Sequence, residues 1–259
     1  MNTHLLDNLP IYVFYFGIVV FILVSFEVGY LIGKHTRKRW DTEASSGIGP
    51  MVGGALGMLA FVLAFTFSMA ASQNDLRKQN VLNEANAIGT AYLRADLIDE
   101  QHGMEIKRLL RDYVNARLGV NKENIGEALA KSIELHGLLW EEVASVAATA
   151  PNTNTSLLIQ AINEVIDMHE KRVTAVLFNR IPATIHLTLL IITALTMMMM
   201  GVQSGLSGPR RLIAIIPLAL AFAALSTVVV DLDRPHRGLV KINQQAMINL
   251  QTSMKSNAK

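Results

Sequence analysis

The sequence predicts an all-α membrane protein with four transmembrane helices, arranged as two pairs with a soluble helical bundle between them. Apolar residues make up 51% of the 259 residues, and charged residues only 17%, against roughly 25% in an average soluble protein. The charges are also unevenly distributed, because residues 72–180 contain 27 of the 44 charged side chains. A polar centre between apolar ends favours two membrane segments that flank a soluble one.

Four apolar stretches are long enough to cross a bilayer, which requires about 20 residues of helix. They are residues 11–33, 51–71, 181–202 and 212–230. Basic residues follow the first stretch instead of preceding it, whereas a secretory signal has its positive charge in front, so we interpret 11–33 as a retained anchor. The domain boundaries predicted on this basis are 1–71, 72–180, 181–230 and a tail, 231–259.

The central region shows apolar residues at helical spacing and is predicted to form three or four amphipathic helices. The chain contains no proline between residues 51 and 150, so we expect the second span to continue into solvent as one long helix. Turn-forming residues predict helix ends near 99–103, 119–124 and 150–155. In the tail, 239–250 is amphipathic and is expected to lie along the membrane interface.

Several function classes are disfavoured by the composition. The chain has no cysteine, and its seven histidines never fall at i, i+3 or i+4 spacing, so we expect no metal site and no cofactor. A net charge of +2 without a basic, aromatic-rich stretch argues against nucleic-acid binding. No combination of nucleophile, base and oxyanion site suggests catalysis, so an enzyme is not expected.

Basic residues in short loops predict the orientation, because they favour the cytoplasmic side. The loops after the first and third spans contain six basic residues: Lys34, Arg37, Lys38, Arg39, Arg210 and Arg211. The tail contains three near the membrane: Arg234, Arg237 and Lys241. This bias predicts that both termini, and the central helices with them, lie outside the cytoplasm.

Specific motifs resemble a bacterial family of membrane proteins called bestrophin-like. The motifs are Phe-Thr-Phe-Ser at 65–68, the 14 residues at 83–96, Leu-Arg-Asp-Tyr-Val at 110–114, and the ending Asp-Leu-Asp-Arg-Pro at 231–235 with Gly238. The resemblance implies a multi-pass protein of the bacterial inner membrane. Its partners would be membrane lipids, small ions and further copies of the chain.

The family takes its name from bestrophins, which are pentameric anion channels with two spans, a helical cytosolic region and two further spans per subunit. The order of elements in this chain is similar. Bestrophin termini lie in the cytosol, however, so this analogy contradicts the orientation predicted from the basic residues. We keep the charge-based orientation as the expectation.

The second span carries a stripe of small residues, which has two interpretations. The stripe comprises Gly53, Gly57, Ala60, Ala64, Ser68 and Ser72. Small residues at this spacing let another helix approach closely, which would be a purely structural role. Alternatively, the helix lines a pore between subunits, with Phe61, Phe65 and Met69 forming an apolar constriction that gates by dewetting. Bestrophin necks resemble this second arrangement.

Other polar residues also have a functional and a structural interpretation. Asn83, Glu84, Asn86 and Thr90 would form either a polar vestibule or a subunit interface. Asp231, Asp233 and Arg234 are interpreted as anchoring residues at a turn after the last span. Glu27 and His186, both inside spans, are better explained by pairing at a helix end and by packing than by proton transfer.

Together these features predict a homo-oligomeric ion channel or pore, and the resemblance to bestrophins implies that anions are the conducted ions. The alternative from another class is a membrane-anchored sensor or scaffold whose helical domain binds a ligand or partner. A stator-like proton-channel subunit would also use a long second helix, but it would need a partner with an intramembrane acid.

Overall fold

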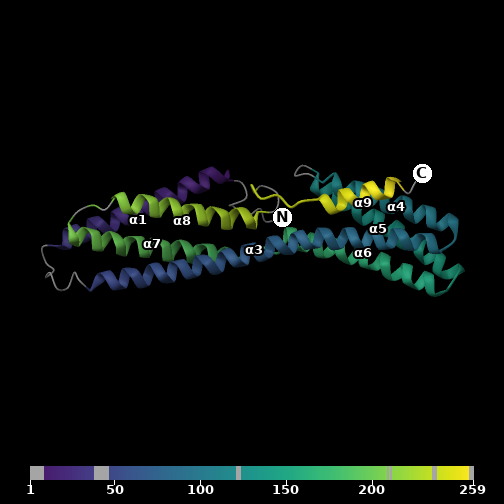
Figure 1. Ribbon diagram of the computed structural model, residues 1–259, viewed down its shortest axis with the longest axis horizontal. Helices are drawn as coiled ribbons and strands as arrows, with labels where there is room; N and C mark the ends of the chain where they lie inside the picture. The colour runs from purple at the N-terminus through teal and green to yellow at the C-terminus, as the bar shows by residue number, and fades with distance from the viewer. Residues whose placement is uncertain are drawn as a thin grey trace. The chain divides into compact units, whose positions relative to one another are not determined.

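The computed structural model describes residues 9–37, 47–120, 124–208, 210, 212–234 and 238–256, and helices are the regular secondary structure of these residues. The helices are α1 (Ile11–Thr36), α3 (Ile48–Arg94), α4 (Glu100–Leu118), α5 (Ile125–Thr149), α6 (Thr153–Leu177), α7 (Ala183–Ser207), α8 (Leu212–Asp233) and α9 (Gln245–Ser256), with a 3₁₀ turn, η3, at Ala95–Leu97 (Figure 1). The predicted all-α class is confirmed. Four of the basic residues that predict the orientation lie outside the described residues: Lys38, Arg39, Arg211 and Arg237.

The four predicted spans are confirmed as helices long and apolar enough to cross a membrane. The helices that contain these spans are Ile11–Thr36, Ile48–Leu97, Ala183–Ser207 and Ile213–Asp233. The second span continues without interruption into the polar region, and α3 ends at Arg94, a few residues before the predicted break. Asp99 then begins α4 as its N-cap, because its carboxylate accepts a hydrogen bond from the His102 backbone N–H.

The chain divides into two compact units, of which the membrane unit comprises residues 1–74 and 180–241. Within it α1 lies against both α7 and α8 (Figure 1). Its core combines side chains of α1, α3, α7 and α8, including Ile22, Leu59, Met197 and Ala219.

Glycines allow α1 and α7 to pack backbone against backbone. A Cβ added at Gly29 or Gly33 would overlap the backbone of Met198 or Val202 on α7. A Cβ on Gly201 or Gly205 would overlap the α1 backbone in the same way. Residue numbers rise together along both helices, so α1 and α7 run parallel. Each helix therefore contributes a Gly-x-x-x-Gly pair, the spacing that permits close helix packing in membranes.

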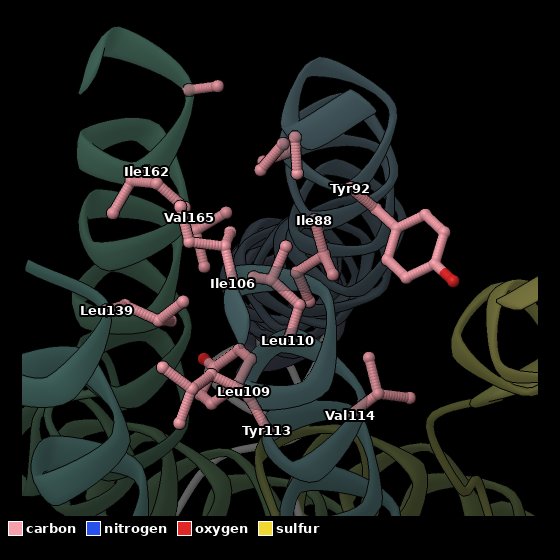
Figure 2. Packing of buried hydrophobic residues seen from close by; sticks show 14 of the residues in the cluster. Ile88, Tyr92, Ile106, Leu109, Leu110, Tyr113, Val114, Leu139, Ile162 and Val165 are labelled. Atoms are coloured by element: carbon pink, nitrogen blue, oxygen red, sulfur yellow. The ribbon is translucent and has the colours of Figure 1, made fainter. Parts of the chain in front are cut away.

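The helical unit comprises residues 75–179 and 242–259. Side chains of α3, α4, α5 and α6 point toward one another in its core, as Figure 2 shows for Ile88, Leu110, Leu139 and Ile162. Helices α3 and α4 bury the apolar stripes that their sequence periodicity predicted. The stripe predicted for α5 is only partly right, because Leu135, Leu139 and Val143 are buried while Ile133 and Trp140 are exposed. The α5 and α6 helices are separated at Ala150–Asn152, where Asn152 caps α6 by accepting a hydrogen bond from the Thr155 backbone N–H.

The tail helix α9 differs from its expectation. Its amphipathic sequence was expected to lie on the membrane interface, but Met247 and Met254 are buried in the core of the helical unit. Gln251 also donates a hydrogen bond of 2.7 Å to Asn115 of α4. The part of the predicted face that lies on α9 therefore packs against protein, whereas Leu239 and Val240, which precede the helix, are exposed.

Candidate functional site

The predicted stripe of small residues lies on an open face of α3 in the single chain. All six members, Gly53, Gly57, Ala60, Ala64, Ser68 and Ser72, are exposed. A Cβ built on Gly53 or Gly57 would meet no atom within 4 Å. The opposite face of the same segment buries Val52, Leu59 and Leu63. The close glycine packing of the membrane unit thus occurs between α1 and α7, and the α3 stripe is free to contact another molecule.

The three residues proposed as a constriction do not share one environment. Phe61 is 73% exposed and Phe65 is 60% exposed, both on the open side of α3. Met69 is half-buried and packs against the core of the membrane unit. An α-helix advances about 100° per residue, so a residue eight positions along has drifted by roughly 80°, which turns Met69 toward the core.

The four polar residues beyond the membrane are also separated by the structure. Asn86 and Thr90 are exposed and Asn83 is half-buried, so these three can face solvent or another subunit. Glu84 is fully buried, with 0% of its side-chain surface exposed. Adjacent helix positions point about 100° apart, which places Glu84 inside the helical unit.

Glu84 is the centre of a buried polar cluster to which four helices contribute. We call it the Glu84 cluster: Glu84 of α3, Tyr113 and Arg117 of α4, His136 of α5, and His169 and Arg172 of α6. Arg117 Nε donates to Glu84 Oε1 at 3.0 Å, and Arg172 Nη1 donates to Glu84 Oε2. The Tyr113 hydroxyl donates to Oε1 at 2.6 Å. A carboxylate with three donors is well compensated for its burial.

The cluster also shifts the pKa values of its own members, Glu84 and Tyr113. Burial alone would raise the pKa of Glu84, but Arg117, Arg172 and the Tyr113 hydrogen bond lower it below its ordinary value of 4.5. Burial and then the Glu84 charge raise the pKa of Tyr113 well above 10. At neutral pH the cluster therefore contains one carboxylate, a neutral phenol and two guanidinium groups.

The anchoring residues of the tail bind backbone groups inside the membrane unit. Asp231 accepts hydrogen bonds from the backbone N–H groups of Leu239 and Val240 at 2.7 and 3.0 Å. Asp233 accepts one from Ile181 N–H at 3.0 Å. Arg234 Nη1 donates to the Leu9 carbonyl at 2.8 Å. All three side chains are buried, so in this arrangement they join segments of the chain to one another.

The two polar residues within the spans have different surroundings. Glu27 forms an ion pair with Arg210 at 2.7 Å, and the Arg210 guanidinium lies over the Tyr30 ring. The pairing links the C-terminal half of α1 to the loop after α7. His186 of α7 has a buried Nε2 atom without a hydrogen-bond partner within the described residues.

Sequence reasoning missed most of the Glu84 cluster. Tyr113 entered only as part of the motif at 110–114, and Arg117, His136, His169 and Arg172 were not singled out. A usable signal was present, because Arg117 follows Tyr113 by four residues and Arg172 follows His169 by three, which places each arginine on the buried face of its helix. Arginine is rarely buried without a partner, so two such positions predict a buried acid elsewhere.

The helices and their lengths define an integral membrane protein of the multi-pass α-helical class. The Bestrophin-like domain matches residues 19–247. The chain therefore belongs to the bestrophin-like family, as its motifs indicated. A comparison with curated protein sequences gives no match.

Solved structures share this fold at low sequence identity. A variant of a bacterial bestrophin homologue from Klebsiella pneumoniae superimposes with a TM-score of 0.62 at 14% identity, over 93% of this chain and 98% of that one. Another structure of a bestrophin homologue from the same organism gives 0.60 at 12% identity, over 92% and 97%. A crystal structure described as a membrane protein variant gives 0.63 at 13% identity, over 92% and 97%. These likenesses establish a common fold.

Proposed function

We propose that this protein is the subunit of a homo-oligomeric ion channel in the bacterial inner membrane, and that the membrane part of α3 lines the conduction path. The observation that carries the proposal is the open face of α3, where six small residues stand beside Phe61 and Phe65. By analogy with the family the assembly is a pentamer. Membership of the bestrophin-like family supports the channel class.

The chemistry of the open face suits a pore with a narrow apolar segment. Phe61 and Phe65 would form apolar rings in a symmetric assembly, and such rings can block ions by excluding water. Ser68 and Ser72 follow as a wider hydroxyl-lined stretch. Beyond these serines, Asp75 is paired with Lys78 at 3.1 Å, so the charges of these two exposed residues cancel. Anions remain our proposal for the conducted species, on the basis of the family resemblance.

Reconstitution in liposomes tests the proposal. Truncation of a pore ring should remove the apolar barrier, so we expect Phe61→Ala and Phe65→Ala to change single-channel conductance or open probability at least several-fold. Phe16→Ala is the matched control, because Phe16 is 61% exposed on α1 and lies on a different helix. Equal currents in all three variants would contradict a constriction at α3.

Cysteine scanning sharpens the same test, because the chain contains no native cysteine. A charged thiosulfonate reagent should block Ser68→Cys channels and leave Val20→Cys channels on α1 unaffected. Faster block by the anionic reagent than by the cationic one would support anion conduction, and the reverse order would oppose it.

A sensor or scaffold remains the second candidate, and one surface feature favours it. Ile133 and Trp140 are exposed on the same side of α5, at i and i+7, and exposed apolar groups of this kind mark partner-binding surfaces. Purified protein distinguishes the two functions. A symmetric oligomer that conducts supports the channel, whereas a monomer or dimer without conductance supports the scaffold.

We further propose the orientation that the basic loops indicate, with both termini and the helical unit outside the cytoplasm. Single cysteines at Ser207 and Ser256 fall on opposite sides of the membrane, because α8 lies between them. An impermeant thiol reagent added to whole spheroplasts should label Ser256→Cys and spare Ser207→Cys. The opposite result would establish the orientation known for bestrophins.

A further inference from the structure

The two histidines of the Glu84 cluster are in contact but have no role in holding Glu84 directly. Their rings lie edge to face with centroids 4.7 Å apart. The His169 side chain is fully buried and that of His136 almost so. The Nε2 atom of each ring is buried and has no hydrogen-bond partner within the described residues. Buried polar atoms are seldom left unpaired, so this pair calls for an explanation.

The hydrogen bonds fix which nitrogen of His169 carries its proton. The Tyr113 hydroxyl has one proton and donates it to Glu84 Oε1 at 2.6 Å. His169 Nδ1 lies 3.0 Å from the same hydroxyl oxygen, so Nδ1–H must be the donor in that contact. The neutral imidazole then has a free lone pair at Nε2. This atom is a base inside the protein, two hydrogen bonds away from Glu84.

The charges that face the pair make a protonated histidine costly. From α3 the facing charge is Glu84, from α4 Arg117, and from α6 Arg172. One carboxylate and two guanidinium groups already give the cluster a charge of +1. A proton taken from solvent by His169 Nε2 raises this to +2, and one taken by His136 raises it to +3. The new N–H groups also lack an acceptor among these neighbours, and unpaired buried charge is strongly destabilising.

We propose that His136 and His169 form an acid-sensitive switch in which proton uptake by the pair loosens the attachment of α3 to α4 and α6 through Glu84. At neutral pH both imidazoles are neutral and the attachment is intact. On acidification the imidazolium groups repel Arg117 and Arg172, which hold Glu84. The helical unit then opens, or exchanges water into the cluster, at its buried centre. The link to conduction, through α3, rests on the proposed channel function, while the opening itself does not.

The pKa values of His136 and His169 determine that acid destabilises the helical unit, and over which pH range. Burial lowers the pKa of His136 to about 4, against the attraction of Glu84. Burial, followed by the charge of Arg117, lowers the pKa of His169 to about 4. The unfolded chain binds these protons near pH 6.5, so stability is complete above that pH and is lost as the pH falls from 6.5 toward 4. Burial opposes ionisation of Glu84, but Arg117, Arg172 and Tyr113 lower its pKa below the ordinary value of 4.5, in the direction that keeps the carboxylate ionised.

Hydrogen exchange of the full-length protein in nanodiscs tests the switch. We expect protection factors of amides around Glu84, Tyr113 and Arg172 to fall at least tenfold between pH 7 and pH 4.5. In the double variant His136→Asn, His169→Asn the fall should be abolished, since asparagine cannot take up the proton and its amide can still donate to Tyr113. His102→Asn is the matched control, because His102 pairs with Glu142 on the same unit but outside the cluster, and it should behave as wild type.

A second measurement covers the case in which the double variant does not fold. Carbon-13 NMR of histidine-labelled wild-type protein should show two imidazoles that stay neutral at pH 5.5. Equal acid sensitivity in wild type and double variant, or titration of both buried imidazoles near pH 6.5 without loss of protection, would overturn the switch. Acid-sensitive exchange in a protein that conducts no ions would instead refute the channel and leave the switch intact.

Discussion

The membrane unit and the helical unit reach close packing by opposite chemical means. In the membrane unit, α1 and α7 approach through Gly29, Gly33, Gly201 and Gly205, where any side chain would collide with a backbone. In the helical unit, helices are joined around Glu84 by large charged side chains that would be costly to separate. Both contacts therefore depend on a few residues. The α1–α7 contact requires glycines, which have no side chain, whereas the Glu84 cluster requires the charges of its side chains.

The helix α3 belongs to both units and shows the same contrast along its length. Its buried positions in the membrane unit are mainly apolar, such as Leu59 and Leu63. In the helical unit they include Arg77, Asn80 and Glu84. Arg77 donates to the Ala175 and Asn179 carbonyls at the end of α6, at 2.9 and 2.8 Å, where carbonyl groups without helix partners attract a cation. In the helical unit α3 thus adds buried polar contacts to its apolar packing around Ile88, whereas in the membrane unit it packs mainly through apolar side chains.

The largest effect should come from Glu84. Replacement of Glu84 by Gln would leave Arg117 and Arg172 buried without a counter-charge, at a cost of about 3–5 kcal/mol in the stability of the helical unit. Thermal unfolding in detergent, followed by circular dichroism, measures this loss. Glu105→Gln is the control, because Glu105 pairs with Arg108 on the surface of α4, where ion pairs contribute little. If the two variants lost the same stability, the buried cluster would not hold the unit together.

An intermediate effect is expected at the α1–α7 contact. The Cβ of Gly29→Ala would overlap the Met198 backbone, and overpacking of this kind costs about 1–3 kcal/mol. Gly17→Ala on the same helix meets no atom within 4 Å and should be neutral or slightly stabilising. Reversible unfolding in mixed SDS micelles compares them. Equal stability of the two variants would show that α1 and α7 do not pack this closely.

The smallest effect on folding is expected at the open face of α3. A Cβ at Gly57 has free space in the single chain, so Gly57→Leu should change the stability of the subunit by less than about 0.5 kcal/mol. The same change should lower the fraction of oligomer, since a bulky side chain would enter the proposed subunit contact or pore. Native mass spectrometry measures assembly, and unaltered assembly would argue that this face contacts lipid.

Much of the fold could be predicted from local patterns, because length and hydropathy decide whether a helix crosses a bilayer. The four spans, the continuation of the second and the break before Pro151 all follow from residues close together in the chain. The α9 helix shows where such patterns fail. An amphipathic helix presents the same face to lipid and to a protein core, so Met247 and Met254 alone could not decide between them.

By itself, the sequence determined the class of the protein, its spans and its family, since apolar length and linear motifs are local properties. Only the tertiary structure decided which small residues pack tightly, and it selected Gly29 and Gly201 over Gly53 and Gly57. It also brought Glu84, Arg117 and Arg172 together across distances of 33 and 88 residues in the chain. The physical reason is that close approach and charge pairing depend on the partner helix, and the identity of that partner is written in no single segment.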